Sequence, residues 1–262
     1  MDIKILTFET IDSTNTEALK QARNGAEEGL CIVAREQTAG RGRHGRVWAS
    51  EKDAGLYFSI VLRPRLEPRY VSLITLMSGI GVFDTLKELG LSPDIKWVND
   101  VLVDERKISG ILAETTETDD GQAVIVGIGI NILRSNISQE LAETATSLDR
   151  YIDPPTPTAL VEMLVSHLSR AYSQLNGPDG PSQIVEEWKR RSTYFTGRNV
   201  RVKLSGETMI GTTDGLEPNG ALRLITPDGK LRIVQAGEIE MLRPDPQPPA
   251  QATNGPKHRP PD

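Results

Sequence analysis

The stretch Gly40-Arg41-Gly42-Arg43-His44-Gly45-Arg46-Val47-Trp48 alternates glycine with arginine and closes with tryptophan. Glycine lets a backbone fold tightly around a ligand and direct its N–H groups at it. Arginine presents a rigid, charged fork that matches phosphate and carboxylate groups, and tryptophan offers a flat face for a ring. The stretch therefore predicts a pocket for an anionic, aromatic small molecule such as a nucleotide.

Three other interpretations fit this stretch when it is taken alone. It could be a solvated basic loop, an Arg/Gly segment that binds RNA, or a basic patch of the nuclear or heparin-binding kind. The regular glycines disfavour the last of these. The chain has 262 residues and a net charge of −6, and an acidic body with one basic loop favours local binding of an anion over binding of a nucleic acid.

The pattern around the stretch predicts an α+β fold. A helix begins at Ser13-Thr14-Asn15, where Thr14 and Glu17 have the spacing of a capping box, and ends at Gly25. Further helices are expected over 71–89 (closed by Gly90), 158–175 and 184–191, and strands over 3–9, 30–36, 56–62, 95–98, 101–104, 107–114 and 123–131. Hairpins between neighbouring strands and separate helices predict a mixed or antiparallel sheet, because a doubly wound parallel sheet would alternate strand and helix.

After Gly197 the pattern changes to short strands over 200–204, 208–213, 221–225 and 231–234, separated by turn residues. This pattern predicts a small β-barrel. From Pro244 onward the chain is rich in proline, glutamine and asparagine, which is typical of disorder. The predicted organisation is a catalytic-type domain over residues 1–194, a barrel over 195–243 and a disordered tail over 244–262.

Composition also bears on location. Cys31 is the single cysteine, so no internal disulfide forms, and its apolar neighbours predict a buried thiol. The N-terminus lacks the pattern of a signal peptide, and no apolar segment has the length of a membrane span. We expect a soluble cytoplasmic protein without a membrane partner.

Three further segments could carry chemistry. Lys96-Trp97-Val98-Asn99-Asp100, followed by Lys107-Ile108-Ser109-Gly110, could direct an ammonium into a pocket where glycine leaves room for a ligand, although an edge-strand lysine is the plainer explanation. Gly127-Ile128-Gly129-Ile130-Asn131 lacks the third glycine of a dinucleotide loop, and it lies in a strand. Ser13-Thr14-Asn15 are ordinary helix-capping residues that could also cradle a polar head group. The sequence contains no phosphate loop of the GxxxxGK[ST] type and no Cys/His metal cluster.

These segments, in this order, resemble the biotin–protein ligases, and the resemblance covers residues 5 to 243. It implies the biotin/lipoate ligase catalytic fold with a C-terminal SH3-like barrel. It also implies a two-step reaction with ATP and Mg²⁺. The carboxylate of biotin attacks the α-phosphate of ATP to give biotinyl-5′-AMP and pyrophosphate, and a lysine of the biotin carboxyl carrier domain of a biotin-dependent carboxylase then displaces AMP.

The resemblance also implies roles for individual residues. The ureido end of biotin and its surroundings are assigned to Ser13, Thr14, Asn15 and Gln37. The loop that closes over biotin and the phosphates is assigned to Arg41, Gly42 and Arg43. The resemblance makes Lys107 the central lysine, against the biotin carboxylate and the α-phosphate, and Gly110 a backbone contact to biotin. The adenine side falls to Trp48 and Asn131, and a phosphate contact to Arg46. Lys107, Arg41 and Arg43 are the implied catalytic residues, and no metal ligand is assigned.

Two departures from the family pattern are visible. Val98 stands where the family usually has proline, and no helix-turn-helix segment precedes Ile3, as it does in family members that are also repressors. We therefore expect no DNA binding, and the protein could be a monomer or a homodimer. The alternatives left open are a lipoate–protein ligase, an RNA-binding protein that uses the Arg/Gly loop, and a biotin sensor without catalysis.

Overall fold

The chain forms two sheets, which a computed structural model describes for residues 1–204, 207–235 and 239–244. The first sheet has seven strands in the order β1-β2-β3-β7-β6-β5-β4. Its only parallel pair is β1 with β2, and the other pairs are antiparallel. The prediction of an α+β fold with a mixed sheet is thus confirmed. The strands are β1 (Lys4–Phe8), β2 (Leu30–Ala34), β3 (Gly55–Leu62), β4 (Pro93–Lys96), β5 (Asp100–Val103), β6 (Arg106–Thr118) and β7 (Gly121–Asn131).

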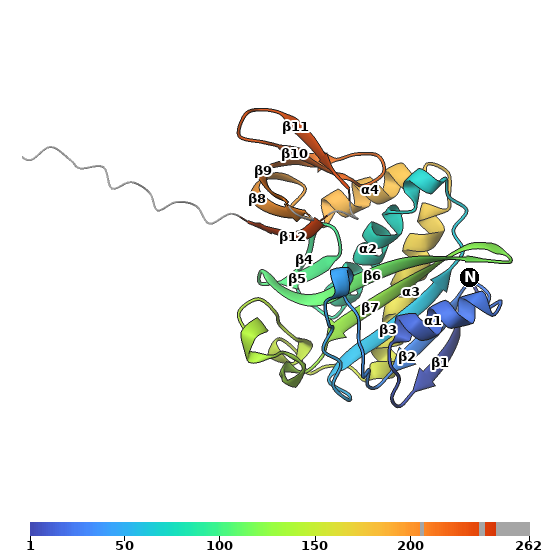
Figure 1. The fold of residues 1–262 in the computed structure, drawn as a ribbon. Helices are drawn as coiled ribbons and strands as arrows, with labels where there is room; N and C mark the ends of the chain where they lie inside the picture. Colours follow the sequence, from blue (N-terminus) through green and yellow to red (C-terminus); the bar gives the residue numbers. More distant parts are fainter. Residues whose placement is uncertain (205–206, 236–238, 245–262) are drawn as a thin grey trace, which may run out of the picture.

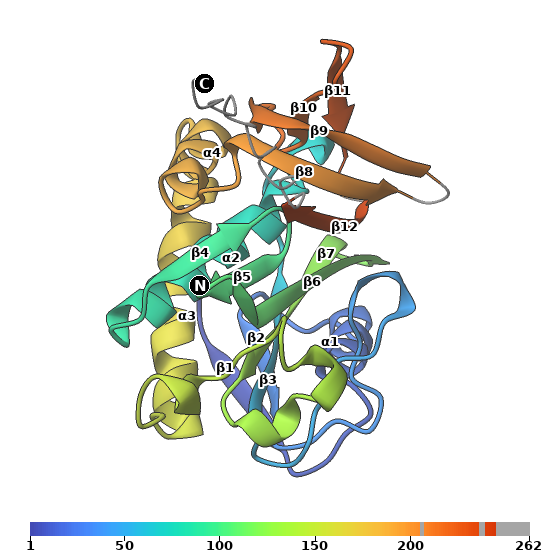
Figure 2. The ribbon, with the colours of Figure 1, turned by 90° about the vertical axis from the view of Figure 1, so that its left-hand side faces the viewer.

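Helices cover both faces of this sheet (Figures 1 and 2). They are α1 (Thr14–Arg23), α2 (Leu73–Glu88), α3 (Pro157–Leu175) and α4 (Gly180–Arg190), with short 3-10 turns at Arg43–Gly45, Pro68–Tyr70, Arg134–Asn136, Gln139–Leu141 and Leu148–Arg150. Alternate residues of β7 explain the arrangement. Ala123 and Ile125 pack in a small cluster with Ala18 of α1, whereas Val124 and Val126 belong to the large core that includes α2 and α3. None of the helices in these described ranges has the length and apolar character needed to cross a bilayer.

The start of α1 differs from the predicted capping box. Ser13 is the N-cap but its side chain makes no capping hydrogen bond, and Glu17 accepts from Gln21 and pairs with Lys20. The backbone N–H of Thr14 is satisfied instead by Gln37 Oε1 at 2.8 Å. The capping-box prediction was wrong because the side chain of Gln37, 23 positions further along the chain, accepts the hydrogen bond that the spacing of Thr14 and Glu17 assigned to Glu17.

The second sheet has five strands in the order β11-β10-β9-β8-β12, all paired antiparallel. They are β8 (Thr196–Leu204), β9 (Glu207–Leu216), β10 (Leu222–Ile225), β11 (Leu231–Val234) and β12 (Ile239–Pro244). The four predicted strands are confirmed and β12 was missed. The predicted disorder of the tail concerns residues that, from 245 onward, lie outside the described ranges, and the domain boundaries stay predictions.

The turn between β9 and β10 holds the second sheet against the first. Trp97 Nε1 donates to Gly220 O at 2.9 Å, and Ser72 Oγ donates to Asn219 O at 2.7 Å. Gly220 has φ +81°, and a Cβ there would lie 2.9 Å from the side chain of Leu73. Glycine therefore serves both the turn and the close approach. The peptide bond between Trp97 and Val98 is cis.

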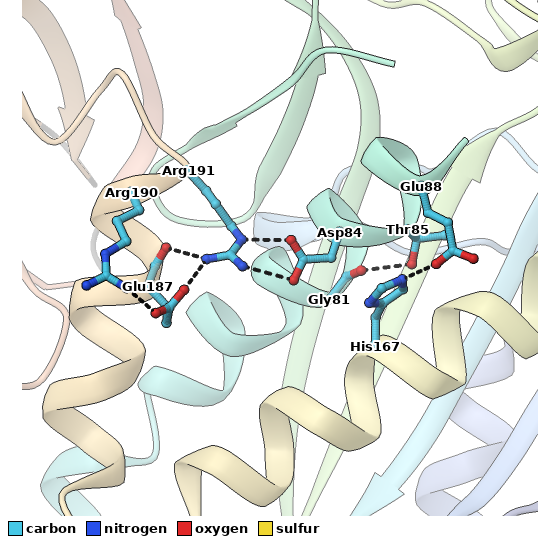
Figure 3. Close-up of polar contacts among 8 residues, drawn as sticks. All are labelled: Gly81, Asp84, Thr85, Glu88, His167, Glu187, Arg190 and Arg191. Atoms are coloured by element: carbon cyan, nitrogen blue, oxygen red, sulfur yellow. Dashed lines mark hydrogen bonds and ion pairs between the residues drawn. The ribbon is translucent and has the colours of Figure 1, made fainter. Parts of the chain in front are cut away.

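Polar contacts join α2 to the end of α4 and, separately, to α3 (Figure 3). Arg191 donates to both carboxylate oxygens of Asp84, at 2.8 and 3.1 Å, and to Glu187 at 2.5 Å. His167 Nε2 lies 2.6 Å from Glu88 Oε2. The hydrogen bond from Arg191 lowers the pKa of the Glu187 carboxyl.

Candidate functional site

A cavity of about 580 Å³, the main cavity of the candidate site, lies against the first sheet. It is lined by the Gly/Arg loop (residues 40–48), by the start of α1, and by β6 and β7. All of the residues that the sequence predicted for the site line it, namely Ser13, Thr14, Asn15, Gln37, Arg41, Gly42, Arg43, Arg46, Trp48, Lys107, Gly110 and Asn131. The fold thus brings together segments that are up to 118 positions apart (131 − 13).

A buried polar cradle forms where α1 begins. Ser13, Thr14 and Asn15 are each less than 5% exposed. Gln37 Oε1 accepts from Thr14, and Gln37 Nε2 donates to Ser50 Oγ at 2.8 Å. Ser59 Oγ on β3 lies 2.8 Å from Thr14 Oγ1 and 2.6 Å from the side-chain oxygen of Asn15. Buried polar groups that are paired in this way have fixed orientations, so the cradle is a rigid wall of the cavity.

The Gly/Arg loop folds back on itself over the cavity. Gly42 N donates to Arg46 O at 2.7 Å, and Trp48 N donates to Gly40 O at 2.9 Å. The tip turns through His44 at φ 55° and Gly45 at φ 73°, which is the left-handed region that glycine adopts without strain. A Cβ at Gly40 would lie 2.4 Å from Trp48 O. The glycines therefore allow both the turn and the close approach of the two arms.

Two arginines of this loop bind different parts of the sheet. Arg41 makes a two-pronged contact with Glu114 of β6, at 3.0 and 2.8 Å. Arg43 Nη1 donates to Asn99 Oδ1 at 3.2 Å. Burial lowers the pKa of the Arg43 guanidinium, although arginine stays protonated in proteins. The loop thus brings permanent positive charge to the cavity.

Lys107 is a further cation that lines the cavity. Its Nζ lies 2.6 Å from Asp100 Oδ1 and 5.4 Å from the centre of a Trp48 ring. Its backbone pairs with the segment after β7, where Lys107 N donates to Thr144 O and Thr146 N donates to Lys107 O. The ammonium is therefore held between a carboxylate and an aromatic face, and it can exchange Asp100 for an anionic ligand.

Glycines on β6 and β7 make the floor of the cavity. Gly110 and Gly129 are direct partners in the sheet. A Cβ on either would meet the indole of Trp48, at 2.9 Å from Gly110 and 2.4 Å from Gly129. A Cβ on Gly127 would lie 2.2 Å from Asn15 Oδ1. The spacing of two between Gly127 and Gly129 thus places both on one face of the strand, one beneath the polar cradle and one beneath the ring.

Comparison with known proteins gives the family. The model of the biotin/lipoate A/B protein ligase family matches residues 7–131, and that of the biotin protein ligase C terminal domain matches residues 195–242. The chain is 32% identical to a biotin–[acetyl-CoA-carboxylase] ligase of Mycobacterium tuberculosis, over 88% of this chain and 86% of the relative. It is also 32% identical to the bifunctional ligase/repressor BirA of Bacillus subtilis, over 90% of this chain and 74% of the relative.

This chain belongs to the biotin protein ligases. The structure agrees, because it superposes with a TM-score of 0.79 on the biotin protein ligase of Aquifex aeolicus in complex with biotin and ATP. The two sequences are 27% identical, over 92% of this chain and 99% of that one. The protein is therefore a ligase enzyme, and the C-terminal match favours a biotin ligase over a lipoate ligase.

Several side chains of this biotin protein ligase site were not predicted from the sequence. Asn136 donates to Asn131 Oδ1 at 3.4 Å and accepts from Tyr57, and Ser59 and Glu114 support the cradle and the loop. Each is an ordinary polar residue in a strand or turn, and its sequence neighbourhood gives no sign of its partner. In the case of Asn131, the side chain also donates to Thr146 O at 3.1 Å.

Metal ligands are sparse at the biotin protein ligase site. Across the described ranges, no three His, Cys, Asp or Glu side chains are grouped so as to hold a metal ion. Magnesium in nucleotide sites is commonly bound by one or two carboxylates together with the phosphates themselves. The cavity wall carries the carboxylates of Asp100 and Glu105, a donor set of the kind that holds magnesium together with nucleotide phosphates.

Proposed function

We propose that this ligase activates biotin as biotinyl-5′-AMP in the main cavity and then transfers biotin to a lysine of a biotin carboxyl carrier domain. The observation that carries the proposal is the convergence of Lys107, Arg41 and Arg43 on one cavity that a neutral polar cradle also lines. A neutral polar wall suits an uncharged ureido ring, and the cationic wall suits carboxylate and phosphate. The Aquifex relative was solved with biotin and ATP, which supports these two substrates.

In the first step, the carboxylate of biotin attacks the α-phosphorus of ATP, and pyrophosphate leaves. Two anions must meet, so their repulsion and the charge that builds on the α-phosphoryl oxygens have to be offset. Lys107 is the residue we assign to both groups, with Arg41 and Arg43 closing from the loop and Arg46 on phosphate. The Lys107 ammonium, which pairs with Asp100 in the structure, would exchange that carboxylate for the reacting groups.

The adenine side is assigned to Trp48 and Asn131, and the biotin side to Ser13, Thr14, Asn15, Gln37, Gly42 and Gly110. The glycine floor supports a shared site, because Gly110 and Gly129 leave the room in which the Trp48 indole and the Lys107 side chain lie against the sheet. Asp100 and Glu105 are the carboxylates on the cavity wall that could hold a magnesium ion bound with ATP, and such an ion would neutralise further charge on the phosphates.

In the second step, a lysine amine of the acceptor attacks the carbonyl of the mixed anhydride, an amide bond forms and AMP leaves. The step needs no covalent enzyme intermediate, and it needs the adenylate to be kept from water. We assign that protection to the Gly/Arg loop, which is hinged by glycines and lies over the cavity. Relatives named for acetyl-CoA carboxylase support a carboxylase carrier domain as the acceptor.

The decisive experiment measures pyrophosphate release with biotin, ATP and magnesium in the absence of any acceptor. The Lys107→Ala variant is expected to lose adenylate formation by orders of magnitude while its unfolding temperature changes little. Lys52→Ala is the matched control, because Lys52 is half exposed, pairs with Glu9 and does not line the cavity. Equal pyrophosphate release by wild type and Lys107→Ala would contradict the role assigned to this lysine.

Cytoplasmic location, the absence of DNA binding and the oligomeric state stay predictions. A gel-shift titration with DNA and sedimentation of the purified chain with and without biotin test the last two. Specific DNA binding by the purified chain would overturn the prediction that it is a ligase without repressor activity.

A further inference from the structure

Glu114 lies at a junction of the site without lining the cavity. Its Oε1 accepts from Arg41 Nη1 at 3.0 Å, and its Oε2 accepts from Arg41 Nη2 and from Asn15 Nδ2, both at 2.8 Å. The side chain is 27% exposed. One carboxylate on β6 therefore ties together the Gly/Arg loop and the polar cradle, which come from segments about 75 to 100 positions away.

The contact fixes the direction of the Asn15 amide. Ser59 Oγ lies 2.6 Å from the oxygen of that amide, while its nitrogen donates to Leu112 O at 3.3 Å and to Glu114. Since an ionised carboxylate can only accept hydrogen bonds, the NH₂ end of Asn15 has to face Glu114. The carbonyl end then faces Ser59, and through it the hydroxyl of Thr14.

The same contact limits the guanidinium of Arg41 to one orientation. Arginine has five N–H donors in a planar fork, and the two-pronged contact with Glu114 uses one on each terminal nitrogen. The donors on the other edges of the plane stay available to a ligand. Holding a flexible side chain in its binding orientation before the ligand arrives removes part of the entropy cost of binding.

We propose that Glu114 is a positioning residue for biotin binding, acting through Arg41 and Asn15. The proposal rests on the proposed function, which assigns these two residues to biotin. The pair is not a major source of fold stability, because Arg41 is 40% exposed and such ion pairs contribute about 0–1 kcal/mol. Its effect is on the arrangement of the site.

The test compares Glu114→Gln with wild type in steady-state kinetics and in calorimetric titration with biotin. Glutamine has the same size but turns an NH₂ group toward either Arg41 or Asn15. We expect the KM and Kd for biotin to rise about 10- to 100-fold, with the KM for ATP within about threefold and the unfolding temperature nearly unchanged. Glu117→Gln is the matched control on the same strand, since Glu117 is exposed and its side chain accepts a hydrogen bond from Gln122 away from the site.

A second pair of variants isolates the route of action. In an Arg41→Ala background, Glu114→Gln should raise the Kd for biotin much less than it does in wild type, because residues in contact are not additive. Equal effects in the two backgrounds, or an unchanged Kd for biotin in Glu114→Gln, would overturn the proposal. If wild type itself neither binds biotin nor releases pyrophosphate, the proposed function fails and this proposal fails with it.

A measurement that needs neither ligand nor activity separates the Glu114 proposal from the proposed function. Trypsin cleaves after arginine, and the Gly/Arg loop carries Arg41, Arg43 and Arg46. Without its tie to β6, the loop of Glu114→Gln should be cut faster than that of wild type in the absence of biotin. Cleavage at the same rate in both proteins would contradict the anchoring role whether or not the enzyme is active.

Discussion

The glycines of β7 give a prediction in which one substitution has two different outcomes. Gly127→Ala and Gly129→Ala each add one methyl group to the same face of the same strand. The Cβ at Gly127 would lie 2.2 Å from Asn15 Oδ1, and the Cβ at Gly129 would lie 2.4 Å from Trp48 Cε2. Both contacts are far too short, so in each case the neighbour has to move. Whether it can move decides the outcome.

The Asn15 side chain cannot move without a large loss of stability. It is 3% exposed and is held by Ser59, Glu114 and Leu112 O. Overpacking costs about 1–3 kcal/mol, and hydrogen bonds lost from a buried amide cost about 1–3 kcal/mol more. Removing glycine from a strand returns about 0.5–1 kcal/mol. We expect Gly127→Ala to lose about 3 kcal/mol of unfolding free energy, which lowers the Tm by roughly 6–12 °C for a chain of this size.

Trp48 can yield, because it is only partly buried and belongs to the Gly/Arg loop. Gly129→Ala should therefore change the unfolding free energy by less than about 1 kcal/mol and should raise the KM for ATP, since the indole is displaced from its seat. Differential scanning calorimetry and steady-state kinetics on both variants make the comparison. A Gly127→Ala protein as stable as wild type, or a Gly129→Ala protein with unchanged KM for ATP, would refute this reasoning.

Three further predictions concern other parts of the molecule. Trp97→Phe removes the donor to Gly220 O and should lower the unfolding free energy by about 1–3 kcal/mol in urea titrations; an unchanged midpoint would argue against this tie between the sheets. The Arg191 hydrogen bond lowers the pKa of Glu187 from its ordinary 4.5, so the stability it contributes is present above pH 4.5 and lost as the pH falls through the folded-state pKa. The unfolding free energy of Glu187→Gln should be about 1 kcal/mol below that of wild type at pH 7. Thermal unfolding measured at several pH values should show this difference shrink below pH 4.5, and a constant difference would count against the pairing. Burial raises the pKa of the Cys31 thiol to about 12, so iodoacetamide at pH 8 should label unfolded but not folded protein by mass spectrometry; rapid labelling of folded protein would be inconsistent with burial.

Local sequence patterns predicted the helices and strands well where the conformation depends on the residue itself and on its neighbours in the chain. The helix ends at Gly25 and Gly90 are confirmed, at φ +84° and +86°, because left-handed termination depends on glycine itself. The apolar run before Asn131 became the central strand β7. The prediction missed β12. Its six residues pair with β8, about 40 positions earlier in the chain, and the local sequence pattern carries no sign of that pairing.

The sequence predicted residues that line one cavity, and it did not predict the contacts among them. Glycine and arginine in the Gly/Arg loop have chemistry that stands out in sequence, and all predicted site residues line one cavity. Their supports are different. Glu114 is one of several acidic residues near the end of β6, and only the pairing of β6 beside the start of α1 gives it Arg41 and Asn15 as partners. Ser59 likewise acquires its role from burial beneath Thr14.

The most direct test of the account is a two-stage assay on the wild-type chain. The first stage, with biotin, ATP and magnesium alone, should release pyrophosphate and leave an adenylate bound to the protein. The second stage, after addition of a biotin carboxyl carrier domain, should release AMP and add one biotinyl group to a single acceptor lysine, as seen by mass spectrometry. Transfer to the acceptor without an adenylate, or no pyrophosphate release with all substrates present, would contradict the account.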